Sequence, residues 1–80
     1  MKYQYLPQGT CSRMMDIEVE DGIVKNVNFQ GGCHGNLQGI AALVTGMAVE
    51  DVIARLEGIR CGHKLTSCPD QLARALKEIQ

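Results

Sequence analysis

The sequence predicts an α+β domain, in which a small antiparallel sheet of about three strands is followed by three helices packed on one of its faces. Two observations support this fold class. Apolar and polar residues alternate through much of the first third of the chain, which is the period of half-buried strands. Apolar residues then recur every three or four positions, which is the period of amphipathic helices. Strands and helices are therefore separated along the chain, as α+β folds require.

Three strands are expected in the first 30 residues. Residues 2–6 form the first strand, and a turn at residues 7–10 ends it. Apolar residues alternate with acidic ones in the second strand, over residues 15–20. The dipeptide Asp21-Gly22 then marks a hairpin turn into the third strand.

The hairpin has two possible registers. A two-residue loop, with Val19 opposite Val24, would turn most apolar residues of the third strand to the wrong face. A three-residue loop, with Val19 opposite Ile23, keeps the apolar residues of both strands on one face. We prefer the three-residue loop, although the shorter loop would gain a charge pair between Glu18 and Lys25.

Three helices are expected after the hairpin, at about residues 36–47, 49–57 and 69–79. Each carries its apolar residues at the spacing of a buried stripe. Asn36 is a candidate N-cap for the first helix. Ser67, which an aspartate follows three residues later, suggests a capping arrangement at the start of the third.

Composition excludes several classes of function. The 80 residues carry a formal net charge of −1, whereas a nucleic-acid-binding domain needs a strongly basic face, so we expect no nucleic-acid partner. No apolar run approaches the roughly 20 residues of a membrane span, and the N-terminus lacks the apolar segment of a signal peptide. We therefore expect a cytoplasmic protein without a membrane partner. In that reducing compartment, cysteines act more often as metal ligands or redox thiols than as disulfides.

All four cysteines fall at the ends of predicted elements. Cys11 and Cys33 lie at the open end of the hairpin, and Cys33 also precedes the first helix. Cys61 lies in the loop before the third helix, and Cys68 directly precedes that helix, whose N-terminus favours a thiolate. Because four thiolates can hold structural zinc or an iron–sulfur cluster, we predict a metal site formed by Cys11, Cys33, Cys61 and Cys68.

Two histidines are alternative ligands. His34 follows Cys33, and His63 lies between Cys61 and Cys68. Either imidazole could replace one sulfur in a mixed site, and each is also consistent with an exposed loop residue. The cysteine spacings do not match a zinc ribbon or finger, since no Cys-x-x-Cys pair is present. The sequence does not decide between zinc and an iron–sulfur cluster.

Two other functions stay open. Cys61 and Cys68 could form a thiol–disulfide pair that passes electrons to a reductase. The chain could also be a protein-interaction domain whose cysteines only support the fold. We find no Ser-His-Asp order, paired carboxylates or cofactor fingerprint, so we do not expect a complete enzyme.

Residues 66–70 spell Thr-Ser-Cys-Pro-Asp, the signature that names the TSCPD-domain family. The chain resembles a small stand-alone member of that family, a single TSCPD-type domain over residues 1–80. Related domains occur at the C-terminus of cobalamin-dependent ribonucleotide reductases, so the resemblance implies a role related to such a reductase. Since the chain is far too short for a reductase barrel, a nucleotide site and a radical site, that role would be accessory.

The chain also resembles iron–sulfur cluster assembly scaffold proteins of the U type. Their order of a cysteine before the hairpin, one before a helix and one before the last helix matches Cys11, Cys33 and Cys68. This resemblance implies the scaffold fold, an iron–sulfur assembly protein as partner, and one site that these three cysteines ligate.

Three departures from the scaffold pattern point to a more closed site. Arg13 stands where the scaffolds have Asp, and Ser67 where they have His. Cys61 is additional and could supply a fourth ligand. Four sulfurs suggest structural zinc or a retained cluster in place of a labile one.

Overall fold

The computed structural model describes residues 1–10, 12–32 and 34–79, with the side chain of residue 34 outside this description. Its three-stranded antiparallel sheet has the order β1-β2-β3, and three helices follow it, which confirms the predicted α+β class. The elements are β1 Lys2–Tyr5, β2 Ser12–Glu20, β3 Ile23–Gly31, α1 His34–Val44, α2 Val49–Leu56 and α3 Cys68–Ile79. In the described part of the chain, no helix is long and apolar enough to cross a membrane.

The turn between β2 and β3 corrects the predicted register. The chain turns through the two residues Asp21 and Gly22, whose φ angles are 53° and 73°. Val19 pairs with Val24, so the preference for a three-residue loop is wrong. Positive φ at both central residues is typical of the tight hairpin turns that Asp-Gly favours.

A β-bulge two residue pairs beyond this turn restores the hydrophobic pattern. The ladder shifts after Val24, so that Lys25 is the extra residue and Ile17 pairs with Val27. Val24 and Val27 are both buried, whereas Lys25 is exposed. The apolar residues thus share one face, as predicted, but a bulge achieves this instead of a longer loop.

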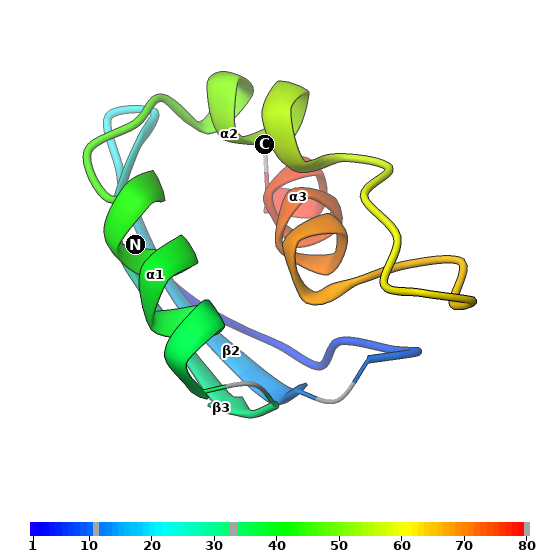
Figure 1. Ribbon diagram of the computed structural model, residues 1–80. Helices are drawn as coiled ribbons and strands as arrows, with labels where there is room; N and C mark the ends of the chain where they lie inside the picture. The colour runs from blue at the N-terminus through cyan, green and yellow to red at the C-terminus, as the bar shows by residue number, and fades with distance from the viewer. Residues whose placement is uncertain (11, 33, 80) are drawn as a thin grey trace.

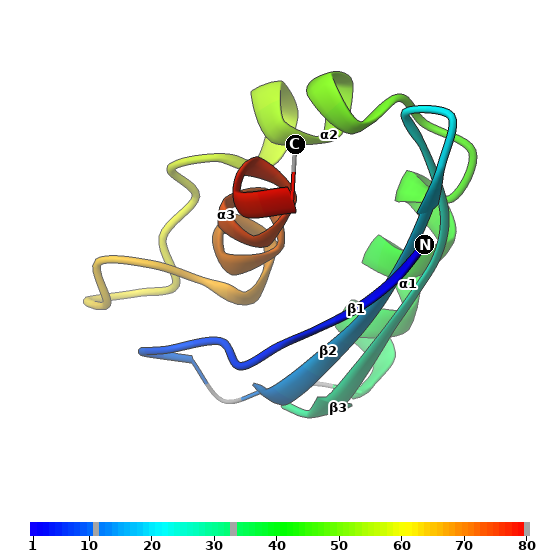
Figure 2. The same cartoon turned by 180° about the vertical axis from the view of Figure 1, so that it is seen from behind.

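One core joins the sheet to the helices. α1 lies beside β3, and α2 packs on α3 (Figures 1 and 2). The buried members of the core are Met15, Ile17, Val24, Val27, Val44, Val49, Val52, Leu72, Ala75 and Leu76. Strands and helices therefore depend on each other for burial, because each presents one apolar face.

Two helices begin earlier than the sequence predicts. α1 begins at His34, so Asn36 lies within its first turn and is not the N-cap. α3 begins at Cys68, and the Oγ of Ser67 accepts a hydrogen bond from the backbone amide of Asp70 at 3.1 Å. The predicted capping arrangement at Ser67 is confirmed, since such a bond satisfies an amide that has no partner within the helix.

The open end of the hairpin and the start of α3 lie at the same end of the molecule (Figure 1). The last pair of the β2–β3 ladder joins Ser12 to Gly31. Ser12 Oγ lies 2.6 Å from the Sγ of Cys68. This end therefore brings together segments that are more than 50 positions apart in the sequence. One of them is the Thr-Ser-Cys-Pro-Asp motif at residues 66–70.

Candidate functional site

A pocket of about 480 Å³ lies between one face of α1, residues 59–64 and the start of α3. Apolar atoms form most of its wall. Cys61 and Cys68 both line it, Cys61 as an exposed residue and Cys68 as a buried one. The structure thus places two of the four predicted ligands at one cavity.

Cys11 and Cys33 lie outside the described residues, so their roles as ligands stay predictions. Their neighbours in the chain are described, however. Thr10, directly before Cys11, lines the same pocket, and so does Gly35, two residues after Cys33.

Of the two alternative ligands, only the side chain of His63 is described. His63 is exposed and is absent from the lining of the cavity, whereas the side chain of His34 lies outside the description. Within the described part of the chain, no group of three or more His, Cys, Asp or Glu side chains could hold a metal ion. A four-thiolate site therefore depends on Cys11 and Cys33.

Asp70 is a deeply buried carboxylate beside the pocket, with 1% of its surface exposed. Burial by itself raises the pKa of Asp70, but other groups oppose it: a hydrogen bond from the Thr66 hydroxyl, one from the Gly58 amide at 2.7 Å, and the charge of Arg74, whose Nε lies 3.0 Å away. The net effect is a pKa below the ordinary value. Asp70 is therefore a buried anion at neutral pH.

This anion holds the loop that carries Cys61 against the helix that carries Cys68. Gly58 follows α2, with a φ of 88°, and opens the loop. Farther along, the backbone amide of Cys61 donates to the carbonyl of Thr66 at 3.1 Å. Hydrogen bonds thus hold the loop at two points. The amide of Gly58 bonds Asp70 directly, and the amide of Cys61 bonds Thr66, whose hydroxyl bonds Asp70.

Gln71 connects the first strand to the same network. Its Nε2 donates to Thr66 Oγ1 at 2.9 Å, and its Oε1 accepts from the Gln8 amide at 3.0 Å and the Tyr5 hydroxyl at 3.3 Å. Burial raises the pKa of Tyr5, which keeps its hydroxyl protonated as a donor. The loop after β1 is therefore tied to the start of α3 by side chains with little exposure.

Reasoning from sequence alone assigned Asp70 only to helix capping and Gly58 only to the end of the second helix, and it did not single out Gln71. One usable signal was Thr66, four residues before Asp70 and just before the capping serine, because its hydroxyl can reach the Asp70 carboxylate and donates to it. Gly58 had no comparable signal, since its contact with Asp70 spans 12 positions.

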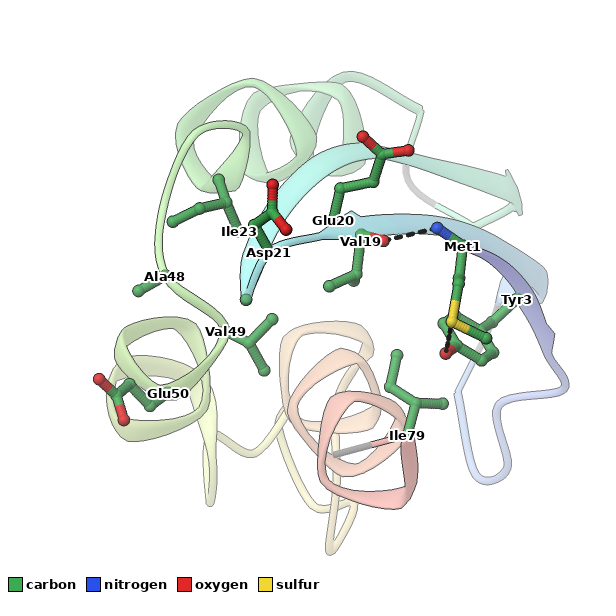
Figure 3. A pocket seen from close by; sticks show the side chains of 11 residues that line it. Met1, Tyr3, Val19, Glu20, Asp21, Ile23, Ala48, Val49, Glu50 and Ile79 are labelled. Carbon is green, nitrogen blue, oxygen red and sulfur yellow. Dashed lines mark hydrogen bonds between the residues drawn. The ribbon is translucent and has the colours of Figure 1, made fainter.

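Among the described residues, none of the predicted ligands lines a larger pocket of about 760 Å³. It is lined by parts of β1, the β2–β3 turn, α2 and the end of α3 (Figure 3). The carboxylate of Glu50 points away from those of Glu20 and Asp21 (Figure 3). The amine of Met1 donates to the carbonyl of Val19 at 2.7 Å. These acids do not converge on one point, so we assign the site to the cysteine-lined pocket.

The comparisons with known proteins agree with the signature at the start of α3. The family model of the TSCPD domain matches residues 1–80, the full length of this chain. Neither a search of curated proteins nor a search of solved structures found a significant match. Residues 66–70, which spell the family signature, are the residues that cap α3 and form the buried network around Asp70. The chain therefore belongs to the TSCPD domain family.

Proposed function

We propose that this protein is a metal-binding module that holds zinc or an iron–sulfur cluster through Cys11, Cys33, Cys61 and Cys68. One observation carries the proposal. Cys61 and Cys68 line a single pocket, and residues within two positions of the other two cysteines line it as well.

The surroundings of the pocket fit thiolate ligands. Arg60 and Lys64 line it, and none of its described lining residues is acidic. Positive charge near sulfur stabilises a thiolate. Cys68 also begins α3, where the helix dipole favours a negative charge.

A thiolate-bound metal would join three elements that are far apart in the sequence: the open end of the hairpin, the loop after α2, and α3. Its binding free energy would then contribute to folding free energy. This contribution is large relative to what an 80-residue core supplies, because small domains bury a low fraction of their surface.

The proposed partner is a ribonucleotide reductase or an iron–sulfur assembly protein, to which this module would be accessory. Membership of the TSCPD family supports the first, and the resemblance to U-type scaffolds supports the second. The nature of the bound metal separates them, since an assembly role requires an iron–sulfur cluster and a purely structural role is served by zinc.

Elemental analysis and visible absorbance of anaerobically purified protein test the metal proposal. Zinc without visible absorbance, or iron with sulfide and a visible absorption band, is the expected result. Cys68→Ser and Cys61→Ser should each lose most of the metal. His63→Ala is the matched control, because His63 belongs to the same loop but does not line the pocket, and it should retain the metal. A folded wild-type protein with four titratable thiols and no metal would overturn the proposal.

A further inference from the structure

We infer that the cysteine-lined pocket is also a docking surface for an acidic, apolar segment of a partner protein. The inference rests on the proposed function in that it names the kind of partner that the same site takes. Exposed apolar residues and surface charge support it, so binding of the partner segment can be tested without reference to the bound metal.

Two large apolar side chains at this pocket are exposed to solvent. Leu43 on α1 is 77% exposed and Ile59 is 41% exposed, and both line the cavity. Leu37, which is buried, and Ile40, which is half-buried, continue the same wall. Large apolar side chains around a recess are typical of surfaces that another molecule covers, because covering them removes apolar area from water.

The charges at the pocket indicate the chemistry of that molecule. The charged side chains among its described lining residues are Arg60 and Lys64, both exposed. The nearby carboxylate of Asp70 is buried and bonded to Arg74, so it does not present a negative charge at the surface. Since the chain as a whole carries a net charge of −1, the positive charge is local. An apolar side chain flanked by carboxylates complements both properties of this surface.

Two other occupants are less suited to the pocket. Basic segments that bind anionic membranes carry about four to eight Lys or Arg residues, and the pocket presents two. A second copy of this chain in a symmetric dimer would place the same surface against itself. Arg60 and Lys64 would then face like charges, which disfavours that interface.

Fluorescence anisotropy with a pool of short synthetic peptides, in which Leu, Ile or Phe is flanked by Asp or Glu, tests the inference. The control pool carries Lys at the acidic positions. We expect saturable binding of acidic peptides only, weakened by salt. We expect their addition to shift the backbone amide signals of the residues that line the pocket. Equal binding of the basic pool, or shifts confined to another surface, would overturn the inference.

A matched pair of variants makes the test specific. Leu43→Ser and Leu65→Ser remove equally exposed leucines, at 77% each, but only Leu43 lines the pocket. We expect Leu43→Ser to weaken peptide binding by roughly tenfold and Leu65→Ser to leave it unchanged. Lys64→Glu should weaken it similarly, and Lys25→Glu, which changes an exposed lysine on β3, should not. Equal losses within either pair would contradict the inference.

Measurements on the same samples separate this inference from the metal proposal. Metal retained by wild-type protein that binds no acidic peptide overturns docking alone. Peptide binding by metal-free, folded protein overturns the metal proposal alone.

Sedimentation, which reports the oligomeric state, and binding to phosphatidylserine vesicles test the two other occupants. A dimer that Leu43→Ser dissociates, or vesicle binding without peptide binding, would assign the pocket to a second copy or to a membrane and so overturn the inference.

Discussion

The backbone amide of Gly58 donates a hydrogen bond to the buried carboxylate of Asp70 at 2.7 Å. Gly58 follows α2, and Asp70 lies in the first turn of α3. One side chain thus spans the two ends of the loop that carries Cys61. Because the same carboxylate accepts from Thr66 and pairs with Arg74, the start of α3 depends on a charged group with almost no exposure to water.

Asp70→Asn should therefore destabilise the protein. The new amide group could still accept from Gly58, but its nitrogen would face the donors of Thr66 and Arg74. Breaking a buried, charged hydrogen-bond network leaves unpaired donors, and we expect the free energy of unfolding to fall by about 2–4 kcal/mol. Urea denaturation measures this loss.

Asp21→Asn is the matched control, since Asp21 is an exposed turn residue with a φ of 53°, which Asn also adopts. We expect it to change stability by less than about 0.5 kcal/mol, and an equal loss in both variants would contradict the role of Asp70.

The lowered pKa of Asp70 also predicts a pH dependence. The folded-state pKa lies below that of the unfolded chain, so this group contributes stability that is fully present above the unfolded value of about 3.9. That contribution is lost as the pH falls through the folded-state pKa. Urea denaturation at a series of pH values should therefore show a steeper acid loss for wild type than for Asp70→Asn, with the two curves converging in acid. Parallel curves would show that Asp70 is not the group whose protonation lowers the stability in acid.

Hydrophobic periodicity was sufficient to predict the type and order of all six elements, because each buries one face. It could not set the hairpin register. Two arrangements place the apolar residues on one face: a loop longer by one residue, or a bulge just beyond a two-residue turn. The hydrophobic pattern is the same for both. The turn preference of Asp21-Gly22, which the observed φ angles satisfy, favours the second arrangement.

Deletion of Lys25 should consequently leave the sheet intact. Without this extra residue the ladder would pass from Val24 directly to Asn26 and keep the same residues against the core. We expect the free energy of unfolding to change by less than about 1 kcal/mol. Deletion of Asn28, another exposed residue of β3, is the control. It would turn Phe29 to the opposite face and should cost at least about 1.5–3 kcal/mol in lost burial. Urea denaturation of both deletion variants decides, and a loss for Lys25 as large as that for Asn28 would contradict the bulge.

The candidate site was only partly predictable for a related reason. Placing helix starts and hairpin ends was enough to put the cysteines at junctions, and Cys61 and Cys68 do line one pocket. Thr66 and Arg74, each four residues from Asp70, are local contacts of the network that positions them. Its contacts between separate elements, as between Gly58 and Asp70, were not predictable. Local sequence patterns report local hydrogen bonds such as the cap of α3, and tertiary contacts leave no such pattern.

Gly9 and Thr66 bring the loop after β1 against the family signature. Gly9 has a φ of +75°, and a Cβ at this position would lie 3.1 Å from Thr66 Cγ2. Gly9→Ala should therefore combine backbone strain of about 1–2 kcal/mol with a contact that forces the Thr66 methyl group to shift. Thr66→Ser removes that methyl group but keeps the hydroxyl that donates to Asp70, so it should relieve the contact and leave the strain.

A double-mutant cycle measured by urea denaturation separates the two effects. Gly9→Ala and Thr66→Ser should couple favourably by about 0.5–1 kcal/mol, since the serine removes the group that the new Cβ meets. Gly46→Ala is the matched control, because Gly46 has a φ of +92° but nothing within 4 Å of a Cβ, and its cost is strain alone. Its cycle with Thr66→Ser should be additive within about 0.3 kcal/mol. Additivity in the Gly9 cycle as well would mean that the loop moves away freely, and that Thr66 is held from the α3 side alone.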